Sequence, residues 1–217
     1  MKNVLKTLRN IALIATGVGI MASSNVSAQN LDAEAIKSLK PGSSYGRINA
    51  SYKLPAEING YTFGEFYSDG DSYFSKTALT KPVLGNVSVM GQIWNGTGMT
   101  DHAGIGVSAI IPTQEKTFAK AYIIPKYVAS TGKAVDNKSV AGYYAEANLP
   151  LDMKISSFGE INLDGTKGPE WMYGELNLEK KLTDNISVSY NPALQKKSAG
   201  NLQPVIENRF TLKYIFK

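Results

Sequence analysis

Apolar and polar residues alternate with a period of two along most of the chain beyond residue 44. Such alternation predicts β-strands that turn one face toward an apolar environment and the other toward a polar one. In 86–94, for example, Val87, Val89 and Ile93 share one face. Eleven segments fit the pattern: 45–54, 59–67, 72–80, 86–94, 103–111, 117–128, 141–149, 153–162, 170–180, 184–192 and 209–217.

The connectors between these strands are short and long in turn. The short ones are 55–57, 81–85, 112–114, 150–152 and 182–185, and the longer polar ones are 68–71, 95–102, 129–139, 164–170 and 192–207. Tight turns at one end and longer loops at the other are typical of an antiparallel up-and-down β-barrel that spans a membrane, although a soluble barrel can share the arrangement.

An internal repeat divides the strands into two halves. The segments 54–57, 63–65 and 69–70 match 149–152, 158–160 and 164–165 at a constant offset of 95 residues. The repeat predicts six strands in each half and about twelve in all, with ten as the alternative, because bacterial barrels usually have an even number. Residues 29–43 would have to supply the twelfth strand, yet Leu31, Ala35, Ile36 and Leu39 share a helical face. That segment is therefore also a candidate helical cap or plug.

The first residues have the order of a secretory signal peptide. Three basic residues precede an apolar stretch from Ile11 to Ala22, which is too short to cross a bilayer as a helix. Small residues then follow at 26–28. We predict a signal peptide over 1–28, with cleavage after Ala28, and therefore export.

The last strand has the clearest pattern. One face carries Phe210, Leu212, Tyr214 and Phe216, and the other carries Arg209, Thr211, Lys213, Ile215 and Lys217. Aromatic residues opposite charged ones suit a wall between lipid and water. This ending resembles the closing strand of bacterial outer-membrane β-barrels, which typically ends in an aromatic residue with a tyrosine two positions earlier; here Lys217 follows that aromatic residue. The resemblance implies contact with outer-membrane lipid and insertion by the barrel-assembly machinery through this strand.

Composition excludes other classes of function. Loss of 1–28 would remove three basic residues and no acidic one, so the formal net charge would fall from +5 to +2 and give no electrostatic argument for nucleic acid. The chain has no cysteine and one histidine, and no motif in it predicts a metal or a cofactor. Beyond Ala28 no apolar stretch approaches the roughly 20 residues of a membrane-spanning helix.

Charged residues of both signs fall on the predicted inner face. The candidates for pore-lining residues are Arg47, Lys53, Glu65, Lys76, Lys120, Lys126, Glu146, Lys154, Glu160, Glu175, Glu179, Arg209 and Lys213. They predict either a polar channel whose charges set solute preference or an ion-paired network that fills a narrow barrel. Side chains fill barrels of about 8 strands, whereas about 16 strands leave a channel, so the strand number leaves both open.

His102 is the one weak candidate for a catalytic residue. Some outer-membrane lipid acyltransferases and deacylases keep a histidine with a serine and an acid near the external rim, and Ser72, Ser139 and Glu170 occupy neighbouring predicted loops. No spacing requires these residues to meet, and a loop histidine needs no catalytic role. We therefore expect no enzyme.

These patterns together predict an all-β protein of the bacterial outer membrane, with its barrel over 44–217. The expected function is a narrow passive channel for ions or small polar solutes, or a closed structural barrel that presents external loops. An outer-membrane lipid-modifying enzyme and a soluble periplasmic lipocalin-like carrier are the alternatives. The sequence leaves the oligomeric state open.

Overall fold

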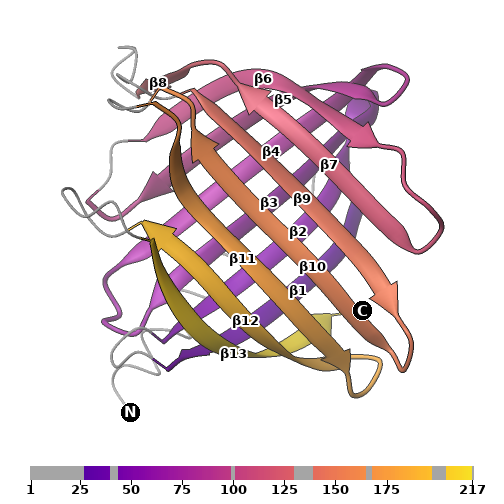
Figure 1. Ribbon diagram of the computed structural model, residues 1–217, viewed down its shortest axis with the longest axis vertical. Helices are drawn as coiled ribbons and strands as arrows, with labels where there is room; N and C mark the ends of the chain where they lie inside the picture. Colours follow the sequence, from indigo (N-terminus) through magenta and orange to yellow (C-terminus); the bar gives the residue numbers. More distant parts are fainter. Residues whose placement is uncertain are drawn as a thin grey trace.

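The chain forms a single closed β-sheet (Figure 1). The computed structural model describes residues 27–39, 44–98, 101–129, 139–164, 168–196 and 204–216. Its strands are β1 (Ser27–Ser38), β2 (Tyr45–Leu54), β3 (Ile58–Tyr67), β4 (Tyr73–Leu84), β5 (Val87–Gly96), β6 (His102–Ile111), β7 (Thr117–Ile124), β8 (Tyr127–Ala129), β9 (Val140–Leu149), β10 (Met153–Asn162), β11 (Glu170–Lys181), β12 (Ile186–Lys196) and β13 (Pro204–Phe216). A single 3₁₀ turn, η1 (Pro55–Glu57), is the only helical element among these residues. No helix in the described ranges is long and apolar enough to cross a membrane.

Twelve wall strands close the barrel. Apart from β7 and β8, each strand pairs antiparallel with its neighbours in the chain; β7 pairs with β6 and β9, and β1 pairs with β13 to complete the ring. β7 and β8 count as one wall strand, because both pair with β6 and only Pro125 and Lys126 separate them. Over the described residues the prediction of an up-and-down barrel with about twelve strands is therefore confirmed.

The twelfth strand is β1, so over the described part of 29–43 the expected strand is right and the alternative of a helical cap or plug is wrong. Its residues pair with β2 from Ser27 to Ile36 and with β13 from Leu31 to Ser38. Without β1, both β2 and β13 would present an unpaired edge, and the backbone hydrogen bonds gained on both sides outweigh the helical preference of alanine and glutamate. The predicted signal peptide lies mostly outside the described residues; cleavage after Ala28 would leave the whole β1–β13 ladder intact.

The connectors separate the two rims as predicted. The turns at η1, 85–86, 112–116, 150–152 and 182–185 lie at one end, and the strand ends that border the other connectors lie at the opposite end. The two halves of the repeat use the same turn: Ala56 and Glu57 have φ of 61° and 62°, and Leu151 and Asp152 have φ of 62° and 54°. This left-handed backbone is uncommon outside glycine. Its recurrence six wall strands later supports two halves related by rotation.

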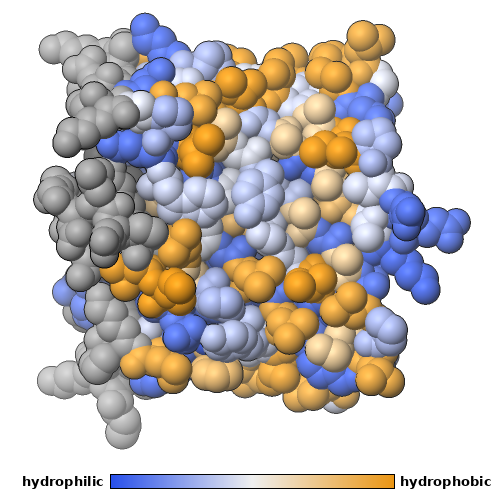
Figure 2. All heavy atoms as spheres, viewed as in Figure 1, coloured by the Kyte–Doolittle hydropathy of each residue, from blue (hydrophilic) through white to orange (hydrophobic). Residues whose placement is uncertain are grey.

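The alternation of side chains gives the wall two different faces. Phe210, Leu212, Tyr214 and Phe216 lie on the outer face, each about half exposed, whereas Arg209 and Thr211 on the same strand are buried on the inner face. Figure 2 shows hydrophobic side chains spread over the visible wall, with hydrophilic ones prominent at the rim. The predicted faces of the last strand are confirmed up to Phe216, and Lys217 lies outside the described residues.

Candidate functional site: the barrel interior

Contacts between strands on opposite sides of the ring identify the inner face. Lys76 on β4 pairs with Glu160 on β10, and Arg47 on β2 pairs with Glu175 on β11. These strands are not neighbours in the sheet, so their side chains meet only across the interior. The inner face is therefore the face that carries the ionic residues.

Arg47 is the centre of one group of charges. Its guanidinium group donates to Glu65 Oε1 through Nε at 3.0 Å and through Nη2 at 2.7 Å. Glu34 and Glu175 each approach its Nη1 to 3.7 Å. The Phe63 ring lies 5.4 Å from the guanidinium carbon. Arginine suits this position because its planar, permanently charged head can serve several acceptors in fixed directions.

Arg209 forms a second group of contacts in the interior, next to that of Arg47. Its Nη1 donates to the hydroxyl of Tyr45 at 2.8 Å and to that of Tyr173 at 3.1 Å, and its Nη2 lies 3.2 Å from Glu207. Tyr45 comes from β2, whereas Tyr173 comes from β11. Arg209 thus joins three parts of the wall through one buried side chain.

A third cation, Lys213, lies nearer the short-turn rim. Its ammonium group is 2.8 Å from Glu179 and 3.4 Å from Glu34. Beside it, Asn49 donates to Asp32 at 2.7 Å and accepts from the Tyr61 hydroxyl at 2.9 Å. Buried polar groups are costly unless they are hydrogen-bonded, and these contacts meet that requirement.

The Lys76–Glu160 pair forms the second crossing of the interior, and we call it the central bridge. The same Oε1 atom of Glu160 also accepts the hydroxyl of Tyr122 on β7. The Lys76 ammonium lies 4.8 Å from the Trp94 ring and 5.2 Å from the Phe158 ring, so cation–π attraction to both rings stabilises its charge. Both Lys76 and Glu160 are buried.

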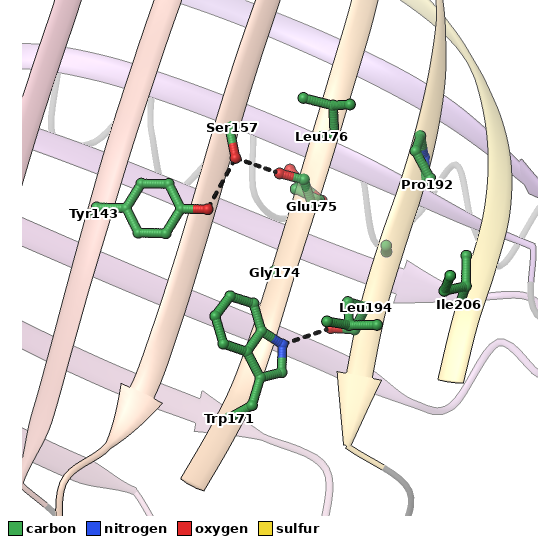
Figure 3. Close-up of a pocket in the computed structure, with 10 residues that line it drawn as sticks. Tyr143, Ser157, Trp171, Gly174, Glu175, Leu176, Pro192, Leu194 and Ile206 are labelled. Atoms are coloured by element: carbon green, nitrogen blue, oxygen red, sulfur yellow. Dashed lines mark hydrogen bonds between the residues drawn. The ribbon is translucent and has the colours of Figure 1, made fainter. Parts of the chain in front are cut away.

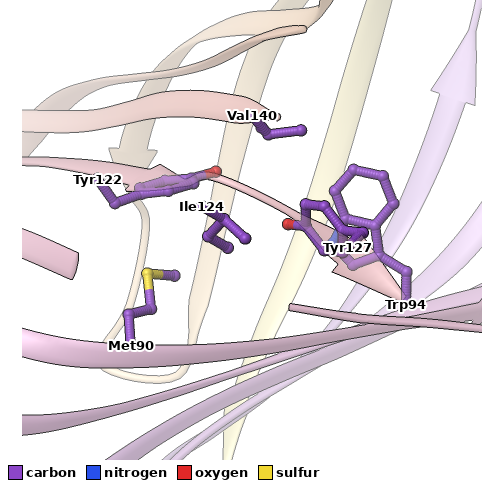
Figure 4. Packing of buried hydrophobic residues seen from close by; sticks show 6 residues of the cluster. All are labelled: Met90, Trp94, Tyr122, Ile124, Tyr127 and Val140. Carbon is purple, nitrogen blue, oxygen red and sulfur yellow. The ribbon is translucent and has the colours of Figure 1, made fainter. Parts of the chain in front are cut away.

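An apolar cluster lies beside the central bridge, on the inner face of β5 to β9 (Figure 4). Its buried members are Met90, Trp94, Tyr122, Ile124, Tyr127 and Val140. Ile124 and Tyr127 have no exposed surface at all, although the wall is only one strand thick. The Tyr127 hydroxyl and the Trp94 indole both donate to the side-chain oxygen of Gln92. This part of the interior is packed like a core.

Two glycines make room for the cluster. A Cβ at Gly104 would lie 2.6 Å from Ile124 Cγ2 and 3.0 Å from the Tyr127 ring. A Cβ at Gly106 would collide with the backbone oxygen of Ile123. Both glycines face inward on β6 and have no side chain, so the chain around Pro125 can pack directly against the backbone of β6.

The remaining predicted charges lie apart from the two crossings. Lys154 pairs with Glu146 on the adjacent strand at 3.7 Å, and each side chain is about one-third exposed. Lys120 and Lys53 belong to β7 and β2, and the register places both on the inner face. Lys126 lies at the irregular step between β7 and β8 and is exposed.

The structure distributes the candidate catalytic residues over separate elements. His102 begins β6 opposite Trp94, Ser139 precedes β9, and Glu170 begins β11. The Ser72 hydroxyl donates to Asp69 in its own loop, and this bond, with the amides of Ser72 and Asp71, holds the pKa of Asp69 below its usual value. In the described ranges no group of three or more histidine or acidic residues is placed to hold a metal ion.

A shallow groove of about 250 Å³ lies on the outer face and not in the interior (Figure 3). Its lining is mainly apolar and includes Trp171, Leu176, Leu194 and Ile206. The Trp171 indole donates to the Leu194 carbonyl at 3.3 Å, and its ring covers Gly174. The groove carries no charged head group toward the outside and adds no chemistry to the interior.

Alternation grouped the ionic residues that meet across the interior, such as Arg47, Lys76 and Glu160, but it missed three features of the interior. The partners across the barrel depend on its curvature, which the alternation does not encode. The inward glycines Gly104 and Gly106 were visible as a Gly-x-Gly pattern, but nothing nearby indicated what would cover them. Asp32 and Glu34 were missed because their segment was left open between a strand and a helical cap or plug.

The comparisons with known proteins support the fold. No family model matches the chain, and no curated protein matches it. Among solved structures it is similar to the NanC porin, with a TM-score of 0.58 and 9% identity over 86% of this chain and 99% of that chain. It is also similar to the KdgM porin, with a TM-score of 0.56 and 10% identity over 87% and 99% of the two chains. A KdgM porin in complex with disordered oligogalacturonate gives a TM-score of 0.57 and 11% identity over the same shares. The chain therefore has the fold of a small outer-membrane porin-type β-barrel.

Proposed function

We propose that this protein is a narrow passive channel of the bacterial outer membrane for ions and small polar solutes. The observation that carries the proposal is a closed twelve-strand wall whose inner face is lined by ion pairs. A barrel of this size is wider than the roughly 8-strand barrels that side chains fill and narrower than the roughly 16-strand porins. The shared fold with two porins favours a channel over an enzyme.

The outer face supports the membrane location. Large apolar side chains such as Ile105, Phe210 and Leu212 are at least half exposed. A soluble protein rarely exposes apolar surface so continuously, whereas lipid would cover it. This face argues against the soluble carrier. It also fits the proposed partners, which are outer-membrane lipid and the barrel-assembly machinery acting on β13.

A closed structural barrel is the second candidate, and the central bridge favours it. Lys76 and Glu160 meet across the interior and are both buried, so part of the cross-section is occupied by side chains. In that case the protein would act through its long loops, because loops are where external partners bind.

Conductance of the purified protein in planar bilayers separates the two candidates. A channel gives discrete, stepwise current increments in potassium chloride; a structural barrel inserts without them. Swelling of liposomes loaded with the protein, in sugars and sugar acids of increasing size, then gives the size and charge class of the solute. Because the KdgM porin has been solved with oligogalacturonate, an acidic oligosaccharide belongs in that series. Protein that inserts fully but never conducts would contradict the channel.

A further inference from the structure

The interior is crossed at two places of different chemistry. The crossing at Arg47 consists of charged groups, with Glu65 and Glu175 as partners of the guanidinium group. The crossing at the central bridge is backed by the apolar cluster, whose inward members Ile124 and Tyr127 are fully buried. An apolar constriction excludes water, so it resists ions more than a charged one of equal width.

Glu160 joins side chains from two other strands at the central bridge. One of its oxygens accepts both the Lys76 ammonium from β4 and the Tyr122 hydroxyl from β7. Lys76 in turn lies against Trp94, which belongs to the apolar cluster, and against Phe158, which packs on that cluster. If Glu160 were absent, Lys76 and Tyr122 would both lose their contact with the same carboxylate.

We propose that Glu160 sets the width of the passage, because it holds Lys76 and Tyr122 together across the interior beside the apolar cluster. This inference rests on the proposed channel and names the residue that determines its size limit. Gly104 and Gly106 contribute to the same constriction. A side chain at either position of β6 would collide with the inward-turning segment that carries Ile124 and Tyr127. The constriction is thus formed by the wall itself, where the chain turns inward at Pro125 between β7 and β8.

Single-channel conductance of Glu160→Ala tests this role. We expect conductance about twofold or more above that of the wild type, since loss of the bridge frees part of the cross-section. Glu146→Ala is the matched control: it makes the same truncation on the inner face, but its partner Lys154 lies on the adjacent strand and the pair does not cross the interior. The control should change conductance much less.

Glu160→Gln separates width from charge. An amide of the same shape can still accept hydrogen bonds from Tyr122 and Lys76, so conductance should stay near the wild-type value. The reversal potential in a salt gradient should shift toward the value of a more anion-selective pore, because one negative charge is lost. Migration of unboiled and boiled samples on a gel establishes that each variant is folded. Should Glu160→Ala fail to fold, Lys76→Ala breaks the same bridge from its other end and carries the same expectation.

The outcomes distinguish this inference from the proposed function. A conducting wild type with Glu160→Ala and Lys76→Ala unchanged would overturn the role of Glu160 and leave the channel intact. A silent wild type with a conducting Glu160→Ala would overturn the proposed channel and would still support the bridge as the contact that closes the interior. Silence in every folded variant would overturn both proposals.

Discussion

A few cations in the interior each serve several carboxylates. Arg47 lies within 4 Å of Glu34, Glu65 and Glu175, and Lys213 lies within the same range of Glu34 and Glu179. Removal of one partner from a buried ion pair is much more costly than removal of both, because it leaves a charge with neither water nor a counter-ion. The interior should therefore be most sensitive to substitutions of these shared cations.

Arg47→Ala should lower the free energy of unfolding by about 3 kcal/mol, since Glu65 loses its cation while Glu34 and Glu175 each keep a weaker contact, to Lys213 and Arg209. Unfolding in urea from lipid vesicles, followed by tryptophan fluorescence, measures the change. Lys181→Ala is the control, because its pair with Asp184 lies in an exposed turn and exposed pairs contribute little. Equal losses in the two variants would contradict the role of Arg47.

At the scale of elements, alternation predicted the faces of strands such as β13 and β6, because each side chain sees either the inside or the outside of a thin wall. It failed for β1, where Leu31, Ala35 and Ile36 also fit a helix. The strand forms there because β2 and β13 both need a neighbour, and that need is a property of the closed ring. The inward turn of the chain at Pro125 could likewise not be predicted from its own segment, because it depends on glycines in β6.

Gly106→Ala should destabilise the barrel by about 1–3 kcal/mol, because the added methyl group would meet the backbone of β7 and overpack the cluster. Gly91→Ala on the neighbouring strand β5 has open space around the same atom. It should be neutral or stabilising by up to about 1 kcal/mol. Thermal unfolding of both variants in detergent tests the pair, and similar behaviour would argue against close packing at Gly106.

Leu212→Arg should cost about 2–4 kcal/mol if the outer face of β13 lies in lipid, because a charge near the middle of a bilayer is poorly solvated. Leu182→Arg places the same charge at a similarly exposed leucine in a short turn. There the cost should stay within about 0.5 kcal/mol. Folding titrations into vesicles compare the two, and equal effects would indicate that water surrounds both positions.

At the scale of the whole molecule, the strand number follows from the repeat. Phe63, Gly64 and Glu65 on β3 correspond to Phe158, Gly159 and Glu160 on β10, six wall strands apart. Each copy places a buried glutamate on the inner face, but Glu65 pairs with arginine and Glu160 with lysine. The repeat is visible in the sequence. That its two glutamates have different partners, Arg47 and Lys76, is visible only in the closed barrel.

Cells that express the full chain should contain it in the outer-membrane fraction, with an N-terminus at Gln29 as determined by mass spectrometry. The unboiled protein should migrate faster on a gel than the boiled one, because a closed barrel with every strand paired resists detergent. A soluble periplasmic protein with one mobility would contradict the membrane proposal. An intact N-terminus would contradict only the cleavage site.

The even division of the ring has a consequence for assembly. The turn at 112–116 joins β6 to β7 at the short-turn rim and separates six wall strands from the next six. Each half would expose two strand edges that only the other half completes, at the β6–β7 seam and at the β1–β13 seam. Two polypeptides divided at this turn should therefore co-refold into one barrel in detergent, and neither should become resistant to protease alone.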